Sequence, residues 1–463
     1  MAKRWLLGAL LMACSEDSMT AATLDGAMAD AATLDAAFGG SDAAVAPDEG
    51  GSDAVAPPVD RAAFCAGAGS AAVLPGGGSR CLGATAEEAF AYAICACESI
   101  ETVGEDVRTD SFDSERDEVV RDSGAPIGTN GSLSVTGGID VGGSLVVGSA
   151  APLEFTGTSP RIGGDLASGG PVRFQGRLRV ERDVRVASVG GVGTLEVGRD
   201  LYTASGRADA TRSDVGGRAV AAAVSVAPPC ACGDTLDIRG AVDAARFAND
   251  NDEVGLEADD FEGIVGTEER TLPCGRFFLT GLSGTGQLTL VVVEGRTALY
   301  IDGDFTLQGG LQLELAEGAE IDVFLTGDLS STGRIEFGDR TAPAKARIYV
   351  GGRGEIDITG NGAFVGNLYA PSATIRSTGG TEVFGALLGQ NIEARGSLVV
   401  HYDRAITRTG EECPDTPCER CGDCGGGVQC DEANMCLPGC TEDAECCGSL
   451  VCSSGGECIP LLI

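Results

Sequence analysis

The single histidine, His401, and two neighbouring carboxylates, Asp302 and Asp304, are the side chains of this 463-residue chain that catalysis would most plainly use. One histidine excludes multi-histidine zinc sites and leaves one candidate for an imidazole-based triad. Two carboxylates two residues apart on one face of a strand would lie about 7 Å apart. That separation is near the range found in inverting glycosidases.

The sequence context of these residues favours structural roles. His401 ends the pattern Leu398-Val-Val-His-Tyr-Asp403, where we expect it to cap the last strand. Asp304 is the aspartate of a short sequence element that recurs along the chain: an apolar residue, two turn residues, aspartate or serine, and another apolar residue. The aspartates at the same place in other copies are Asp165, Asp183, Asp200 and Asp328. An aspartate that recurs at one corner serves the turn, because its side chain hydrogen-bonds nearby backbone amides. We therefore predict no catalytic residues and no enzymatic activity.

An acidic stretch in the middle of the chain has the oxygen ligands that calcium prefers. Its two segments are Asn249-Asp-Asn-Asp-Glu253 and Glu257-Ala-Asp-Asp-Phe-Glu262. The candidate calcium ligands are Asp250, Asp252, Glu253, Asp259 and Asp260. The spacing lacks the glycine and the final glutamate of an EF-hand loop, so a solvated acidic loop is the favoured interpretation. We expect no other metal and no organic cofactor.

Eighteen of the 19 cysteines are candidates for disulfide bonds. They are Cys65, Cys81, Cys95, Cys97, Cys230, Cys232, Cys274, Cys413, Cys418, Cys421, Cys424, Cys430, Cys436, Cys440, Cys446, Cys447, Cys452 and Cys458. An even number permits full pairing and predicts an oxidising compartment outside the cytoplasm. If the first four pair with one another, one bond must join the middle three to the tail. The Cys-x2-Cys spacing in the tail is also a zinc-ligand spacing, but without a nearby histidine disulfides are favoured.

The remaining cysteine, Cys14, ends an N-terminus that reads as a leader. Met1-Ala-Lys-Arg4 is basic, residues 5–12 are apolar, and Leu11-Met-Ala-Cys14 resembles the bacterial lipobox, whose cysteine becomes lipidated. The alternative is an N-terminal helix with an incidental cysteine. Eight apolar residues are too few to span a bilayer. The resemblance implies membrane attachment through N-terminal acyl chains, and Ser15 in place of aspartate implies the outer membrane.

Composition restricts the classes of partner and of fold. A net charge of −37 argues against nucleic-acid binding, which needs clustered lysine and arginine. The 71 glycines are about twice the usual share, and aromatic residues make up only 5% of the chain. These values favour many short strands joined by tight turns.

The chain divides into segments of different composition. We predict a signal peptide over residues 1–14, a disordered tether over 15–63, a cysteine-stapled cap over 64–102, a charged linker over 103–130, a β-helix over 131–406 and a disulfide-rich module over 413–458. We expect a helix over residues 86–94 of the cap. We expect a partly helical excursion at about 203–278, clipped at its base, with a short helix within residues 235–249.

The central segment repeats one short element: an apolar residue, two turn residues, aspartate or serine, and another apolar residue. Val141-Gly-Gly-Ser-Leu145 and Ile162-Gly-Gly-Asp-Leu166 are examples, and successive copies lie 17 to 24 residues apart. A repeat of about 20 residues built from short strands predicts a solenoid. We predict an all-β, right-handed parallel β-helix with the excursion and small disulfide-rich terminal modules. A β-sandwich is the alternative.

Three stretches resemble known families. Val365-Gly-Asn-Leu-Tyr-Ala-Pro-Ser-Ala-Thr-Ile375 and Phe384-Gly-Ala-Leu-Leu-Gly-Gln-Asn-Ile392 are similar to the last coils of an uncharacterised β-helical domain in bacterial surface proteins, including PilX-like ones. Cys95-Ala-Cys97 and Cys230-Ala-Cys232 resemble predicted myxobacterial lipoproteins. The tail from Cys436 to Cys458 resembles knottin and Dickkopf-like frameworks. These resemblances imply a fold and no particular activity.

The expected function follows from the anchor, the solenoid and the cysteines together. We expect a non-catalytic cell-envelope lipoprotein that acts as a structural or adhesive surface β-helix, in the outer membrane or at the cell surface. Its expected partners are the membrane and an envelope polysaccharide or surface protein, with no nucleic acid. The alternative is a carbohydrate-binding or polysaccharide-cleaving β-helix.

Overall fold

The computed structural model describes residues 60–66, 72–73, 79–80, 82–104, 106–116, 124–157, 159–233, 236–358 and 363–409, and the backbone of residues 450–452 and 458–460. The predictions for the leader, for Cys14, for the tether up to residue 59, for Cys81 and for the cysteine side chains of residues 413–458 lie outside the described residues. The last residues of the predicted tether are not disordered, because a helix begins at Arg61.

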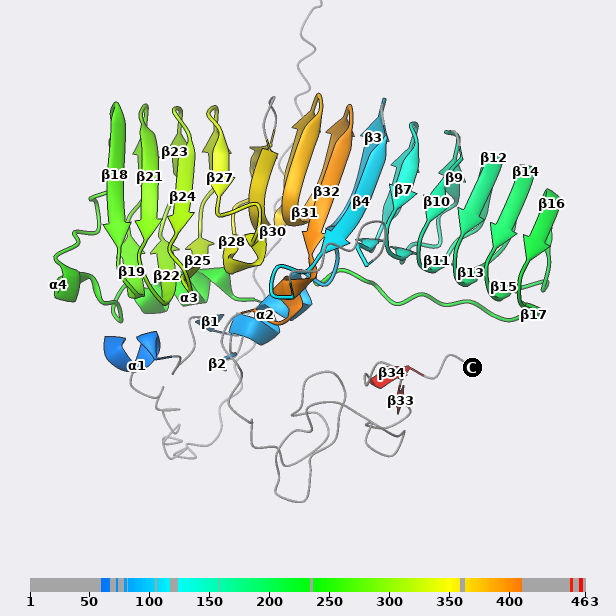
Figure 1. Ribbon diagram of the computed structural model, residues 1–463, viewed down its shortest axis with the longest axis horizontal. Coiled ribbons are helices and arrows are strands. Elements are labelled where there is room, and N and C mark those ends of the chain that lie inside the picture. The colour runs from blue at the N-terminus through cyan, green and yellow to red at the C-terminus, as the bar shows by residue number, and fades with distance from the viewer. Residues whose placement is uncertain are drawn as a thin grey trace, which may run out of the picture. The chain divides into compact units, whose positions relative to one another are not determined.

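The fold is the predicted parallel β-helix, in which each coil has three faces (Figure 1). Neighbouring coils pair in parallel throughout the solenoid, for example Val172–Val180 with Val189–Val197. A β-sandwich would need antiparallel layers, so that alternative is wrong. Antiparallel pairing in the described residues is confined to two small ribbons, β1 (Ala72–Val73) with β2 (Ser79–Arg80) and β33 (Leu450–Cys452) with β34 (Cys458–Pro460).

We call the three faces A, B and C, and several long strands bend from one face to the next. Face A contains β19 (Gly275–Leu279), β22 (Arg296–Ile301), β25 (Glu320–Leu325), β28 (Ala346–Val350), the middle of β30 (Ala363–Thr378) and of β31 (Thr381–Arg395), the start of β3 (Ile94–Val103), β5 (Ile127–Thr129), β8 (Leu145–Val147), β11 (Leu166–Ser168), β13 (Val184–Val186), β15 (Leu201–Thr203) and β17 (Ala219–Ala221).

Faces B and C complete each coil. Face B contains β20 (Leu282–Gly284), β23 (Phe305–Leu307), β26 (Leu329–Ser331), β29 (Glu355–Asp357), the ends of β30, β31 and β3, β6 (Ser132–Val135), β9 (Leu153–Phe155) and the starts of β12 (Val172–Val180), β14 (Val189–Val197) and β16 (Ala208–Val215). Face C contains β18 (Thr267–Leu272), β21 (Gln287–Val292), β24 (Leu311–Leu315), β27 (Ile335–Phe337), the starts of β30 and β31, β32 (Leu398–Asp403), β4 (Val107–Phe112), β7 (Ile139–Val141), β10 (Arg161–Ile162) and the ends of β12, β14 and β16.

The strands form because apolar residues alternate with polar or small ones. In β8 the side chains of Leu145 and Val147 are buried, and Val146 between them faces outward. The same alternation in the next coil stacks Leu166 on Leu145, so each strand buries its inner side chains only against its neighbours. The core is therefore a continuous column of valine, isoleucine, leucine and phenylalanine inside the coils.

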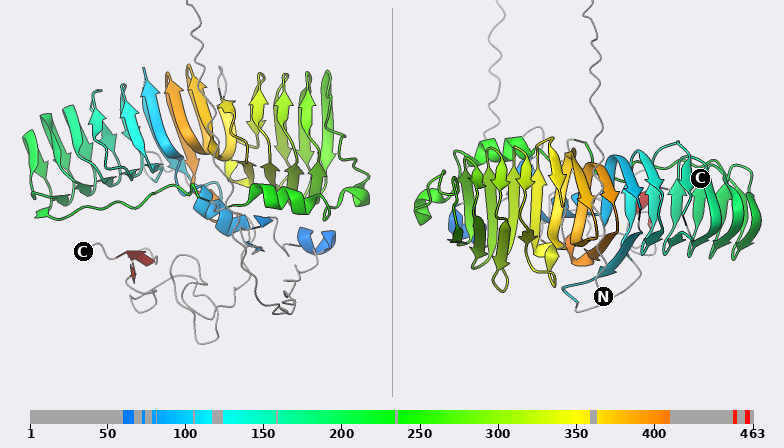
Figure 2. Two further views of the ribbon diagram at one scale, coloured as in Figure 1. Left: turned by 180° about the vertical axis from the view of Figure 1, so that it is seen from behind. Right: turned by 90° about the horizontal axis from the view of Figure 1, so that it is seen from above.

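The chain does not run through the solenoid in sequence order. An N-terminal half, β3 to β17, begins in the middle and winds to one end, and a C-terminal half, β18 to β32, begins at the opposite end and winds back (Figures 1 and 2). The halves meet where β31 pairs with β3 and β32 pairs with β4. One coil is thus shared, with β32 on face C and β3 on faces A and B.

This path corrects the predicted domain boundaries. Residues 94–103 and 107–112 belong to the first coils, although they were expected in the cap and in the charged linker. The cap's helix is α2 (Leu82–Ala89), which ends before the expected stretch does. Residues 107–112 were predicted as a charged linker because Arg108 and Asp110 are charged. These residues alternate with Val107, Thr109 and Ser111, which are buried, as in a strand.

The excursion predicted at about residues 203–278 is shorter than expected and has a different structural role. β16 and β17 still belong to the solenoid, and residues 222–233 then lead from its end back to the middle (Figure 1). The expected short helix is present as α3 (Ile238–Ala245) and is followed by α4 (Asn251–Val254). The segment therefore connects the two halves and is not a loop that returns to its own base.

Helices cover face A of the C-terminal half. α3 packs on β19, β22 and β25, and α1 (Arg61–Cys65) packs on β19 and β22. Two short 3-10 helices, η1 (Pro343–Lys345) and η2 (Arg404–Thr407), contact each other and the end of the shared coil. Within the described part of the chain, none of the helices has the length and apolar character that crossing a membrane requires.

Candidate functional site

The recurring aspartates form a ladder along one corner of the solenoid. In the N-terminal half the Oδ1 atom of Asp165 accepts the backbone N–H of Asp183 at 2.9 Å, and Oδ1 of Asp183 accepts that of Asp200 at 3.0 Å. Asp200 continues the ladder by accepting the N–H of Arg218 at 2.7 Å, and the hydrogen bonds from Arg218 lower the pKa of Asp200. Each carboxylate thus satisfies a corner amide of the next coil.

The same ladder explains the candidate carboxylate pair. Oδ1 of Asp304 accepts the N–H of Asp328 at 2.8 Å, which confirms that Asp304 serves the turn. Asp302 is bound differently, because it pairs with Arg246, the C-cap residue of α3, and accepts a hydrogen bond from the hydroxyl of Thr326 at 3.3 Å. The structure therefore engages the two carboxylates with separate partners and does not leave them as a free pair.

His401 lies in the middle of the solenoid and not at its end. Its Nδ1 atom is 2.6 Å from Oδ1 of Asp110 on β4, and its Nε2 atom is 3.1 Å from Oε1 of Glu382 on β31. The imidazole packs at 4.7 Å from the ring of Phe384. The hydrogen bond to Asp110 is the largest cause of the raised pKa of His401. The prediction that His401 caps a terminal strand is wrong, because β32 is paired on both sides.

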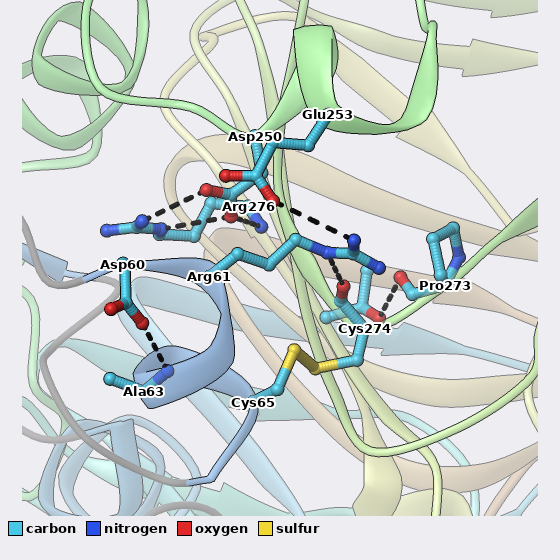
Figure 3. Close-up of a disulfide and its surroundings, with 10 residues drawn as sticks. Asp60, Arg61, Ala63, Cys65, Asp250, Glu253, Pro273, Cys274 and Arg276 are labelled. Carbon is cyan, nitrogen blue, oxygen red and sulfur yellow. Dashed lines mark hydrogen bonds and ion pairs between the residues drawn. A yellow bond between two sulfur atoms is a disulfide. The ribbon is translucent and has the colours of Figure 1, made fainter.

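The calcium candidates are not brought together as a site. Oδ1 of Asp250 is 3.1 Å from Arg276, and its Oδ2 accepts the backbone N–H of Arg276 at 2.7 Å (Figure 3). Glu253 is 3.9 Å from Arg61, and Asp260 accepts the N–H of Glu257 at 2.9 Å. Among the residues with described positions, no three histidine, cysteine or acidic side chains are grouped to hold a metal ion. Asp250 and its neighbours instead close the end of the solenoid.

Among the described residues, three disulfides link segments far apart in sequence. They are Cys65–Cys274, Cys95–Cys230 and Cys97–Cys232. The hypothesis that the N-terminal cysteines pair with one another is therefore wrong for Cys65, Cys95 and Cys97. The bond that it required between the middle segment and the tail is wrong as well, because all three middle cysteines have N-terminal partners. Cys95 and Cys97 are on the first coil, and their bonds fix the connecting segment to it. Figure 3 shows how Cys65 on α1 reaches Cys274, whose carbonyl also accepts a hydrogen bond from Arg61 at 2.8 Å.

Sequence reasoning missed a buried cluster on the outside of face A. Arg347 and Asp322 are both fully buried, with Nε of Arg347 2.6 Å from Oδ1 of Asp322. Beside them Phe324 stacks on Tyr300 and on Tyr349, with ring centroids 5.3 and 5.0 Å apart. Outward-facing aromatic residues in consecutive coils are the sequence signal that this face is covered.

Faces B and C carry paired charges. On face C of the N-terminal half Arg161 lies 3.5 Å from Asp140, and Arg177 lies 3.3 Å from Glu196. A groove of about 520 Å³ lies over face B of this half. Its polar lining residues are Glu154, Thr156, Arg173, Gln175, Ser188 and Asp209. Such flat, polar, repeating surfaces are suited to an extended ligand more than to a small enclosed one.

The comparisons with known proteins concern the solenoid. A family described as "Domain of unknown function (DUF7305)" matches residues 231–409, which include the C-terminal half. No curated protein matches the chain. A solved structure, the ice binding protein from an Antarctic bacterium Flavobacteriaceae, is similar over 69% of this chain and 98% of its own, with 12% identity and a TM-score of 0.18.

Proposed function

We propose that this protein is a non-catalytic envelope lipoprotein whose β-helix presents faces B and C as a structural or adhesive surface. The observation that most supports this proposal is that the three faces differ in their exposure. Helices cover face A of the C-terminal half, whereas outward positions of the other two faces are exposed, such as Thr306 on face B and Arg179 on face C. A surface that repeats along stacked coils suits an extended partner.

The bonding of the candidate catalytic groups supports a non-catalytic role. Both ring nitrogens of His401 are engaged by carboxylates, so neither is directed at a substrate. A general base must reach the proton that it removes. Asp302 and Asp304 are likewise occupied by Arg246 and by a backbone amide.

The disulfides support a location outside the cytoplasm, where such bonds persist. α1 begins within the last residues of the predicted tether, packs on face A and is bonded through Cys65 to Cys274, the residue before β19. A tether anchored by acylated Cys14 would therefore join the protein on its covered side. Faces B and C would then be available to an envelope polysaccharide or surface protein, and two or three acyl chains would make the anchoring stable.

Localisation experiments test the anchor and the orientation. We expect the wild-type chain in the membrane fraction and accessible to protease on intact cells, and a Cys14→Ser variant released from the membrane. Wild-type protein in the soluble cytoplasmic fraction would contradict the proposal.

The groove beside Arg173 favours a second candidate function, binding or cleavage of a polysaccharide. A glycan array combined with a reducing-sugar assay separates the two. Under the first proposal no reducing ends appear. Oligosaccharide release that is lost in Asp302→Asn, and kept in the exposed control Asp357→Asn, would overturn it. Glycan binding lost in Arg173→Ser and kept in Arg334→Ser would place a sugar in the groove.

A further inference from the structure

The two ends of the solenoid are built differently. At the end formed by β18, β19 and β20, residues 250–264 cover the outer edges of β19 and β20. The N–H of Phe278 is bound by the side chain of Asn251 at 3.0 Å, and the N–H of Thr280 by the carbonyl of Ala258 at 2.8 Å. Phe261 and Ile264 are buried there. The chain itself therefore covers faces A and B of this end, in the way that solenoid ends are generally protected.

The opposite end has no such cover in the described part of the chain. β16 pairs only with β14, and β17 pairs only with β15, so the outer edges of both strands face away from the solenoid. Every residue of these two strands is exposed or half-buried. The connecting segment leaves β17 and runs back along the coils (Figure 1). An exposed strand edge is a template for pairing with another chain.

The composition of this last coil suits an interface. Five of its inward positions hold alanine or serine, and four of these five stack on a larger residue of the preceding coil. The five are Ala208, Ala210, Ser213, Ala219 and Ala221. Small side chains leave the backbone accessible and expose little apolar surface. Charges of both signs alternate outward, from Arg207 and Asp209 to Arg212 and Asp214. When two such edges run antiparallel, the positive side chains of one lie beside the negative side chains of the other.

We propose that the open end pairs with the open end of a second copy of this chain. A two-fold axis near Ala210 and Thr211 would set β16 antiparallel to β16 of the other copy, with Asp209 of each beside Arg212 of the other. β17 would pair with its own copy on face A. The dimer closes, because a two-fold interface uses the open end of both copies and leaves no second open end of this kind. This inference does not depend on the proposed function.

Sedimentation velocity and light scattering across a range of concentrations test the proposal on the full chain with Cys14→Ser, which removes acyl association. We expect a reversible monomer–dimer equilibrium. Ser213→Lys places a charge at the open edge, where the native serine is already exposed, and should weaken the dimer by roughly tenfold or more. The matched control Thr306→Lys, at an exposed position of face B far from the end, should leave the equilibrium unchanged.

A charge exchange tests the arrangement. Arg212→Asp should weaken the dimer, and adding Asp209→Arg should restore it. Hydrogen exchange of residues 208–221 should slow as the protein concentration rises. A monomer at all concentrations, a dimer unaffected by Ser213→Lys, growth into longer assemblies, or protection of residues 208–221 that is independent of concentration would each overturn the proposal. The last result would mean that another part of the same chain covers the edge.

Discussion

His401 and Asp110 join the two halves of the solenoid, with Nδ1 of the histidine 2.6 Å from Oδ1 of the aspartate. The residues are 291 positions apart in sequence, yet they face each other on β32 and β4. The contact lies in the region where the last strand of the chain's second half pairs with the first coils. It makes the stability of this junction dependent on the protonation of one side chain.

Stability should therefore fall as the pH rises through the titration of His401. The pKa of His401 is raised in the folded protein by Asp110 and Glu382, so the protonated form stabilises the fold. This contribution is fully present below the unfolded pKa of about 6.5 and is lost as the pH passes the higher folded pKa. His401→Gln should cost about 1–2 kcal/mol at pH 5.5 and much less at pH 9. Thermal unfolding across this range measures the difference, and an equal loss at both pH values would contradict the prediction.

Removing a corner aspartate should destabilise the N-terminal half locally. Asp183→Ala leaves the N–H of Asp200 without its acceptor and should cost about 1 kcal/mol. Asp183→Asn keeps an oxygen in place and should cost less. Asp357→Ala removes an exposed aspartate outside the ladder and serves as the control. Hydrogen exchange should show faster opening of β13 and β15 in Asp183→Ala, and not in the control Asp357→Ala. Equal effects of Asp183→Ala and Asp357→Ala would show that the ladder does not stabilise the corner.

Breaking the buried ion pair on face A should destabilise the fold strongly, whereas replacing both partners with apolar residues should destabilise it much less. Asp322→Ala leaves the guanidinium of Arg347 buried with less compensation, although Glu320 at 2.9 Å remains, and should cost about 3 kcal/mol. The double variant Asp322→Leu/Arg347→Met should recover most of that loss, because apolar residues of similar volume avoid burying charge. Denaturant unfolding of both variants provides the comparison. A double variant no more stable than Asp322→Ala would indicate that the pair is also needed for packing.

The sequence was sufficient to predict the coils but not their order. Alternation in strands such as Leu145–Val147 and the recurring corner aspartates predicted a parallel β-helix and the structural role of Asp304. These signals are local, and every coil carries nearly the same ones. Nothing local therefore identifies β31 as the neighbour of β3, since the inner side chains of many coils would stack on it equally well. Asp110 was missed as a partner of His401 for the same reason.

The disulfides were unpredictable because pairing depends on that order. Cys95 and Cys97 face Cys230 and Cys232 only because the connecting segment passes over the first coil on its way to the opposite end. In a solenoid wound in sequence order the two pairs would be several coils apart. The odd number of cysteines in the middle segment predicted one bond from it to the tail, provided that the first four cysteines paired with one another. That prediction was wrong, because all three middle cysteines bond to N-terminal ones.

Removing the two parallel disulfides should release the connecting segment. Each closes a loop of 135 residues, for which the loss of a cross-link typically costs about 2–4 kcal/mol. The variant with Cys95, Cys97, Cys230 and Cys232 all replaced by alanine should be cleaved within residues 222–233 by a broad-specificity protease at concentrations that leave the wild type intact. Cys65→Ala/Cys274→Ala removes the bond to α1 and should leave that segment protected, while lowering the melting temperature. If the segment resists cleavage in the fourfold variant, its hydrogen bonds to Asn130 suffice to hold it and the disulfides do not fix its path.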